Sequence, residues 1–333
     1  MHLISVFIIP AILFYCTFCK AADTPVDLKI NVLESIDVNG TKQWLLIRTN
    51  DTSKPVLLYL HGGPGQSLIP FAYVATKDLV NHFIVVYWDQ RGTGLSLNED
   101  IDPKTMKISQ MIEDTHIVSE YLKKRFEKNK IILLGHSWGS TLGTFVINKY
   151  PDDYFAYIGV GQVVRPEEQE RVGVEWLKKI LHEKGSAEEK SKIALMEKRN
   201  FTDRSLLKKY GGVVHNIPIE KISEIMHNSP YATEKYTADV YKRGLKFASP
   251  LHEEVKTVDF FKQVPAIKIP VYFFLGKYDY VTPTEPVVRY FNLLKAPKKQ
   301  IIWFEHSGHR IDIEESDKFQ KEIMRISIDN FYE

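Results

Sequence analysis

Short continuous apolar runs alternate with longer segments of helical periodicity through most of the chain. Residues 108–126, for example, carry apolar side chains at roughly helical spacing between two such runs. Uninterrupted apolar runs are typical of strands that are buried on both faces of a parallel sheet and covered by helices. The pattern therefore predicts an α/β fold with a mostly parallel sheet, whose strands we expect in PVLLYL, HFIVVYW, KIILL, YFAYIGV, IPVYFFL and KQIIWF.

Two β-rich segments precede this pattern. Residues 28–36 and 42–49 flank Asn39-Gly40, which is a strong signal for a two-residue hairpin turn. We also expect helices over residues 138–150 and 316–332, the second of which is amphipathic and closes the chain.

The alternation of runs and helices stops between Val163 and about Val258. This stretch is rich in Lys and Glu, has the pattern of helices with turn breaks and contains no evident buried strand. We expect a helical cap over residues 163–258, inserted into one catalytic domain that residues 23–162 and 259–333 form together.

The first 22 residues have a different character. An uncharged apolar run extends from Leu3 to Cys19 and is followed by Lys20 and small residues. The run is shorter than the roughly 20 apolar residues that a membrane-spanning helix needs. Small residues after such a run are typical of a secretory signal peptide. We expect residues 1–22 to be cleaved and the protein to be secreted or periplasmic, without a stable membrane span; an uncleaved anchor or a lipidated Cys19 are the alternatives.

Composition excludes several classes of protein. Both cysteines, Cys16 and Cys19, lie in the N-terminal segment, so the mature chain would have no disulfide, no thiolate nucleophile and no Cys-type zinc site. The chain has 44 basic and 42 acidic residues without a long block of either sign, so nothing indicates nucleic-acid binding. No metal cluster or cofactor motif is evident. Three N-x-[ST] sites, at Asn39, Asn50 and Asn200, are candidate glycosylation sites in an exported chain.

The strongest chemical signal is Gly135-His136-Ser137-Trp138-Gly139. This G-x-S-x-G sequence ends an apolar run and begins a helix, which is the context of a nucleophile elbow. In such a turn the serine Oγ projects over the carboxyl end of the sheet, and the backbone N–H of Trp138 can face an oxyanion. A glycine-rich turn without chemistry could have the same letters, but the strand before it and the helix after it favour Ser137 as a nucleophile.

A serine needs a base, and His309 is the best candidate. It directly follows the last apolar strand, at the sheet edge where Ser137 should lie, and Gly308 before it suggests a loop that presents the ring. His306 is the competing candidate. His136 adjoins the nucleophile, but neighbouring side chains in such a turn point apart.

Asp279 is the candidate acid that would orient this base. It lies in the loop after the run VYFFLG, whereas the backup candidate Glu305 is expected to face solvent or an ion-pair partner. The resulting chain order of Ser137, Asp279 and His309 is that of the α/β-hydrolase triad.

The loop after PVLLYL supplies the second part of an oxyanion hole. The strand ends at His61, and the backbone N–H of Gly63 is expected to act with that of Trp138. A phosphate-binding glycine loop is disfavoured because no Gly-Lys-Ser/Thr follows and because Pro64 lacks an N–H donor.

These segments resemble the proline iminopeptidase family of α/β-hydrolases, on the motifs HGGPG (61–65), DQRGTGLS (89–96), GHSWGST (135–141), GKYDYVTP (276–283) and SGH (307–309). The resemblance implies a serine peptidase that releases N-terminal residues, often proline, beneath a helical cap. It implies the triad Ser137, Asp279 and His309 and the oxyanion donors Gly63 and Trp138. It further implies that Asp89 and Arg91 form a structural ion pair. The chain departs from the family at His136, where a glycine is usual, and in its cap.

Three functions follow in order of preference. The first is an aminopeptidase that releases N-terminal residues from peptides, preferring proline, through an acyl-enzyme. The second is a carboxylesterase or other acyl hydrolase on the same fold, and the third is a non-enzymatic binding protein. An aminopeptidase must pair the substrate's cationic amine with carboxylates. Our candidates are the acids at the start of the cap, Glu167, Glu168, Glu170 and Glu175.

Overall fold

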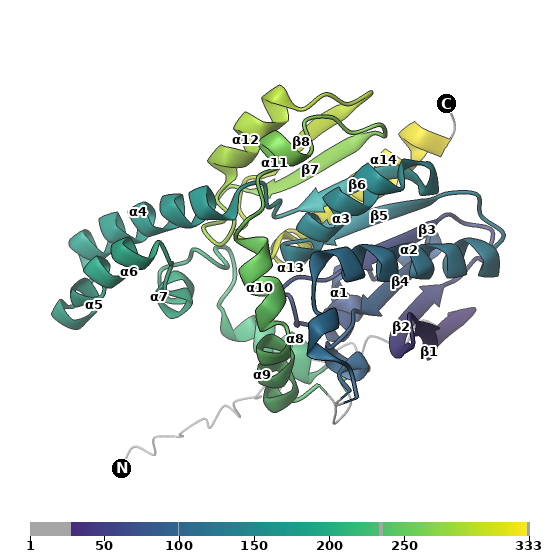
Figure 1. Ribbon diagram of the computed structural model, residues 1–333, viewed down its shortest axis with the longest axis horizontal. Helices are drawn as coiled ribbons and strands as arrows, with labels where there is room; N and C mark the ends of the chain where they lie inside the picture. The colour runs from purple at the N-terminus through teal and green to yellow at the C-terminus, as the bar shows by residue number, and fades with distance from the viewer. Residues whose placement is uncertain (1–27, 99, 233–235, 332–333) are drawn as a thin grey trace, which may run out of the picture.

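One eight-stranded sheet organises the protein, in the strand order β1-β2-β4-β3-β5-β6-β7-β8 (Figure 1). The computed structural model describes residues 28–331 except residue 99 and residues 233–235. The β1–β2 and β2–β4 pairs are antiparallel and all other pairs are parallel, which confirms the mostly parallel sheet. The strands are β1 (Ile30–Val38), β2 (Thr41–Thr49), β3 (Val56–Leu60), β4 (Ile84–Asp89), β5 (Ile131–His136), β6 (Tyr154–Val160), β7 (Val271–Gly276) and β8 (Lys299–Phe304).

The expected hairpin joins the first two strands. Asn39 and Gly40 have φ angles of 51° and 71°, as a turn with two left-handed central residues requires. The Gly40 N–H donates to the Asp37 carboxylate, which closes the turn.

Helices cover both faces of the sheet. The central strands β3, β4 and β5 are therefore buried along their whole length. Helices α2, α3, α11 and α12 lie on one face of the sheet, and α1, α13 and α14 lie on the other (Figure 1). Their apolar side chains form two separate core clusters with the strands. These helices are α1 (Ala72–Ala75), α2 (Ile108–Arg125), α3 (Trp138–Lys149), α11 (Phe260–Gln263), α12 (Thr284–Leu293), α13 (Ile311–Glu314) and α14 (Ser316–Phe331).

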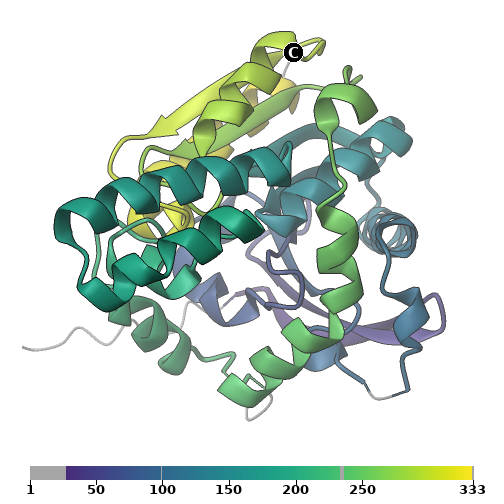
Figure 2. The same cartoon turned by 60° about the vertical axis from the view of Figure 1, so that its left-hand side comes forward.

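Between β6 and β7 the regular elements that the structure describes are all helices, and loops join them. Helices α4 to α7 extend away from the sheet, whereas α8 to α10 lie along the sheet domain (Figures 1 and 2). The extended part has a small apolar core of its own, which includes Val174, Leu177 and Leu207. The cap helices are α4 (Pro166–Lys184), α5 (Ala187–Ser191), α6 (Ile193–Arg199), α7 (Arg204–Lys209), α8 (Glu220–His227), α9 (Ala238–Phe247) and α10 (Ser249–Val255).

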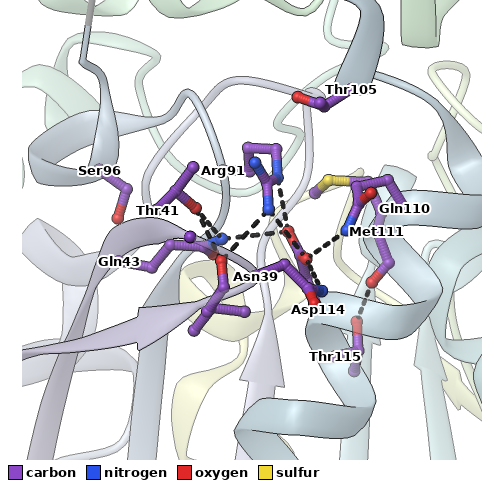
Figure 3. Close-up of polar contacts among 12 residues, drawn as sticks. Asn39, Thr41, Gln43, Arg91, Ser96, Thr105, Gln110, Met111, Asp114 and Thr115 are labelled. Atoms are coloured by element: carbon purple, nitrogen blue, oxygen red, sulfur yellow. Dashed lines mark hydrogen bonds and ion pairs between the residues drawn. The ribbon is translucent and has the colours of Figure 1, made fainter. Parts of the chain in front are cut away.

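The expected ion pair between Asp89 and Arg91 is wrong. The Arg91 guanidinium instead forms two hydrogen bonds of 2.7 and 3.0 Å with Asp114 of α2. Gln43 and Asn39 of the hairpin donate to the same carboxylate (Figure 3). Arg91 and Asp114 are 2% and 0% exposed, so the pair is desolvated. Arg91 thus fastens the loop after β4 to α2 and to the β1–β2 turn.

The predicted signal peptide, with Cys16 and Cys19, lies outside the described residues. Within the part of the chain that the structure describes, no helix combines the length and apolar character needed to cross a bilayer.

Candidate active site

Ser137 occupies the turn between β5 and α3. Its φ and ψ angles are 56° and −119°, a conformation that non-glycine residues rarely adopt. The two flanking glycines explain how the turn fits. A Cβ atom on Gly135 would lie 2.2 Å from Gly139 O, and one on Gly139 would lie 2.2 Å from Leu60 O. Both positions therefore need glycine because strand and helix backbones approach too closely for a side chain.

The base and the acid are in direct contact. His309 Nδ1 lies 2.8 Å from Asp279 Oδ2, and the two residues are 8% and 3% exposed. The Thr282 hydroxyl also donates to Asp279 Oδ2, at 2.7 Å. Because Asp279 accepts from Nδ1, the other ring nitrogen, Nε2, is left to act as the proton acceptor. This is the arrangement that a general base requires.

Burial and the groups around Asp279 set the charge of its carboxyl group. Burial alone raises the pKa of its carboxyl group. The positive charge that His309 can carry and its hydrogen bond, together with donors from Thr282, outweigh burial and hold the pKa below its usual value. Asp279 is therefore ionised at neutral pH and stabilises an imidazolium on His309.

The nucleophile and the base come together at the carboxyl edge of the sheet. His136, next to Ser137, places its Nε2 2.9 Å from the backbone oxygen of His309. Gly161, after the neighbouring strand β6, lies against the His309 ring, because a Cβ there would lie 3.0 Å from Cε1. The structure thus brings the predicted triad residues into one site.

The competing residues have other roles. Burial lowers the pKa of His136 to about 3, so this ring is neutral and donates from Nε2 to a carbonyl. His306 is exposed, and Glu305 forms a 2.8 Å ion pair with Lys277. None of the three is positioned as the base or acid of Ser137.

The glycine loop after β3 lies beside the nucleophile. A Cβ on Gly62 would lie 3.0 Å from Ser137 Cβ, so this backbone must approach the serine closely. Gly63 follows with a φ of 111°, which only glycine adopts readily. The loop is therefore close enough to contribute a donor, and the pairing of the Gly63 and Trp138 N–H groups stays a prediction.

Gln90 is a supporting residue that sequence reasoning missed. Its Oε1 accepts from the Trp138 indole at 2.9 Å, and its Nε2 donates to His61 O at 3.2 Å. It therefore joins the oxyanion loop to the nucleophile turn. Its position inside the DQRG motif was the available signal.

Two of the proposed amine-binding glutamates are already neutralised. Glu168 contacts Arg165, Arg171 and Arg289. Glu170 contacts Arg204 and accepts from the Thr202 N–H at 2.9 Å. Neither carboxylate has a spare charge for a substrate amine unless these arginines move.

The other two, Glu167 and Glu175, are exposed. They line a depression of about 600 Å³ with Glu197 and Arg171. The opposite face of α4 packs toward the triad, where Trp176 stacks on Tyr280 at 4.0 Å beside Asp279. The structure therefore places Glu167 and Glu175 on the side of α4 away from the loop that carries Asp279, which we call the acid loop.

A cluster with metal-binding residue types lies elsewhere. His116, Glu120 and Asp153 place ligand atoms within 4.8 Å of one another. Lys123 Nζ contacts both carboxylates, lying 2.5 Å from Asp153. Asp153 precedes β6, whose other end faces the triad, so the cluster lies at the opposite edge of the sheet. Lys123 therefore already supplies the positive charge that these two carboxylates need.

A serine on a strained strand-to-helix turn, with a buried His–Asp pair at the same sheet edge, defines the class of protein. The fold is that of the α/β-hydrolases, and the site is that of a serine hydrolase.

The comparison with protein families makes the assignment more specific. Residues 51–316 match the family described as "Serine aminopeptidase, S33". A "Probable aminopeptidase YbaC" of Bacillus subtilis is 32% identical over 316 residues, which cover 90% of this chain and 98% of that protein. A proline iminopeptidase of Saccharolobus solfataricus is 27% identical over 83% of this chain and 85% of its own. The chain belongs to the serine aminopeptidase S33 family.

Solved structures show the same fold with different activities in their names. A proline iminopeptidase-related protein from Thermus thermophilus superposes with a TM-score of 0.66 at 18% identity, over 90% of this chain and 98% of its own. An esterase from Exiguobacterium antarcticum superposes with a TM-score of 0.62 at 18% identity, over 89% and 99%. At these identities the likeness supports the fold alone.

Proposed function

We propose that the protein is an aminopeptidase that releases N-terminal residues from peptides through an acyl-enzyme. The observation that carries this proposal is the buried Asp279–His309 pair beside the Ser137 turn, in a chain similar along 90% of its length to a probable aminopeptidase. The fold supplies the serine chemistry, and the relatives supply the choice of a peptide substrate.

The proposed reaction begins with proton transfer. His309 Nε2 takes the Ser137 proton while Oγ attacks the carbonyl carbon of the first peptide bond. The N–H groups of Gly63 and Trp138 stabilise the oxyanion that forms. His309 then protonates the leaving amine, the C–N bond breaks, and water hydrolyses the ester with His309 again acting as base.

A preference for N-terminal proline is the finer part of the proposal. It is supported by the several relatives named proline iminopeptidase. Arylamides of proline, alanine and leucine test it, and we expect the largest kcat/KM with proline. A larger kcat/KM with alanine or leucine would restrict the proposal to a general aminopeptidase.

Recognition of the free amine separates a peptidase from an esterase. Among the proposed acids, Glu167 makes no ion pair with a described residue, and Glu175 is exposed near Lys178. We expect Gln at one of the four positions to raise KM for amine substrates tenfold or more, about 1.4 kcal/mol. Hydrolysis of a neutral ester should not change. Glu168 and Glu170 are paired with arginines, and Glu167 and Glu175 lie on the side of α4 away from the acid loop. Parent-like KM values in all four variants would therefore place the amine site elsewhere.

The decisive assay compares each arylamide with its N-acetylated form. An aminopeptidase cleaves the free amine and rejects the acetylated substrate, because its amine site loses the cation. Equal cleavage of the free and the N-acetylated arylamides would refute the aminopeptidase proposal. A carboxylesterase, which the two neutralised glutamates favour, would take its place.

We also propose that the protein is exported. The apolar N-terminal segment supports this, with cleavage near Ala22 or Asp23. N-terminal sequencing of protein from its native source tests it, and an intact Met1 in a soluble cytosolic fraction would refute it.

A further inference from the structure

A short cap segment lies across the loops that carry the acid and the base. We call residues 212–216 the strap; they lie in the connection between α7 and α8. The strap has no helical or strand structure of its own. Its position is set by contacts with the catalytic loops and with α13.

The strap contacts the acid loop on both sides of Asp279. Gly212 O accepts from the Tyr280 N–H at 3.0 Å. The His215 ring stacks on Tyr278 with a centroid distance of 3.4 Å and an angle of 6° between the ring planes.

The strap also contacts the base directly. Val213 O accepts from the backbone N–H of His309 at 2.7 Å. Gly308 lies so close that a Cβ there would be 2.7 Å from Val213 O. The glycine before the base is therefore required by the strap.

Glu314 of α13 joins the two segments. Its Oε1 accepts from the Gly308 N–H at 2.8 Å. Its Oε2 accepts from the N–H groups of His215 and Asn216 at 2.5 and 2.9 Å. The side chain is 8% exposed, so one buried carboxylate satisfies three backbone donors from the base loop and the strap.

We propose that Glu314 is a positioning residue that locks the strap to the base loop, so that the geometry of His309 depends on the seating of the cap. The cap is then part of the catalytic machinery and not only a cover over the substrate. The inference rests on the serine chemistry of Ser137 and His309, and it does not need the substrate to be a peptide.

Glu315 provides a matched control. Its Oε2 accepts from the His306 N–H at 3.0 Å and from the Ser307 hydroxyl at 2.6 Å, so it supports the same loop. Within the described residues it has no hydrogen bond to the strap. The same change from Glu to Gln therefore separates general support of the loop from the link to the cap.

The experiment uses the full chain with Glu314→Gln, Glu315→Gln, His215→Ala and the double variant Glu314→Gln/His215→Ala. A fluorophosphonate probe reacts with an activated serine by losing fluoride and needs no amine site. We expect Glu314→Gln to lower the labelling rate about tenfold, because small displacements of a catalytic group are costly. On a p-nitrophenyl ester, kcat should fall while KM stays the same. Glu315→Gln should label at the parent rate.

The double variant tests the link itself. Glu314 and His215 hold the same segment, so we expect His215→Ala to slow labelling and the double variant to lose no more than Glu314→Gln alone. Additive losses, equal losses in the Glu314 and Glu315 variants, or labelling of a folded Glu314→Gln variant at the parent rate would each overturn the proposal.

The test remains decisive if one variant fails to fold or if the substrate is not a peptide. If Glu314→Gln does not fold, His215→Ala still tests whether the seating of the strap sets the geometry of His309, because its exposed side chain stacks on Tyr278. Slower labelling supports that dependence, and the parent rate overturns it. Labelling of the parent protein does not depend on its peptide preference. Failure of the aminopeptidase proposal in the arylamide assays is therefore distinguishable from failure of this one.

Discussion

At the scale of single residues, His136 has the least expected role. Its Nε2 donates to the carbonyl of the catalytic base at 2.9 Å, and its ring centroid lies 4.7 Å from that of His309. Burial keeps the ring neutral by lowering its pKa to about 3. A cation at this distance would oppose the imidazolium that forms on His309 during the reaction. A neutral donor holds the loop without that penalty.

Substitutions at His136 test this role. A leucine removes the donor and leaves the His309 carbonyl buried without a partner, so we expect kcat to fall about tenfold with little change in KM. Glutamine carries an N–H donor near the position of Nε2 and should retain activity within about threefold, if one hydrogen bond is the cause. Steady-state kinetics on a neutral ester measure both. Equal activity of His136→Leu and the parent would contradict the account.

At the scale of elements, the buried ion pair between Arg91 and Asp114 joins three parts of the chain. It lies where the loop after β4 meets α2 and the β1–β2 turn (Figure 3). Asp114 also accepts from Gln110 one turn earlier on α2, at 2.9 Å. These donors compensate the desolvation of the Asp114 carboxylate, and Asp114 and the Val38 carbonyl compensate that of the Arg91 guanidinium.

We expect Asp114→Ala to lower the free energy of unfolding by about 3–5 kcal/mol, because it leaves the Arg91 guanidinium buried without a counter-charge. Urea denaturation measures this change. The exposed pair of Lys256 and Glu253 provides the control, and Glu253→Ala should change stability by less than about 1 kcal/mol. Similar losses in both variants would contradict the account.

Sequence periodicity predicts elements better than it predicts their contacts. The strands β3 to β8 and the helices α2, α3 and α14 follow from apolar runs and helical spacing, because burial on a sheet imposes those patterns. The partner of Arg91 does not follow. Asp89 is near in sequence, but Asp114, 23 positions away, is brought to the guanidinium by the packing of α2. No local pattern encodes that distance.

In the candidate site, too, the sequence predicts the residues but not all of their contacts. Ser137, Asp279 and His309 could be proposed because each follows a recognisable strand at the same sheet edge. The contact from Val213 O to the His309 N–H uses backbone atoms, which any residue carries. Such contacts leave no mark in side-chain chemistry, so the link between cap and base required the structure.

At the scale of the whole molecule, the cap is fastened to the sheet domain at more than one point. Besides the strap, the Tyr236 hydroxyl donates to Asp89 at 2.8 Å, and a Cβ on Gly65 of the glycine loop would lie 2.5 Å from Gly244 O of α9. Asp89 has no cationic partner among the described residues, and its Oδ1 has no hydrogen bond. Burial raises the pKa of its carboxyl group to about 6.

This carboxyl group makes stability depend on pH. Its pKa is higher in the folded state than the ordinary value of 3.8, so its favourable contribution is complete below about pH 4 and is lost as pH rises through 6. Tyr236 and Tyr241 are the titratable groups from the cap that face it, and both stay neutral in this range. We expect Asp89→Asn to gain about 2–3 kcal/mol of unfolding free energy relative to the parent between pH 4 and pH 7.

Urea denaturation of the parent and of Asp89→Asn at pH 4 and pH 7 measures this difference in unfolding free energy. Asp279 is present in both proteins, so its titration does not contribute to the difference. A stability difference that is the same at pH 4 and pH 7 would show that Asp89 does not titrate in this window.

The central claim is that Ser137 is the nucleophile and that His309 activates it. Mass spectrometry of the protein after fluorophosphonate treatment, with peptide mapping of the adduct, tests this most directly. We predict one adduct per chain on Ser137, none on Ser137→Ala, and labelling slowed by orders of magnitude in His309→Ala. An adduct on another residue, or parent-like labelling of His309→Ala, would contradict the account.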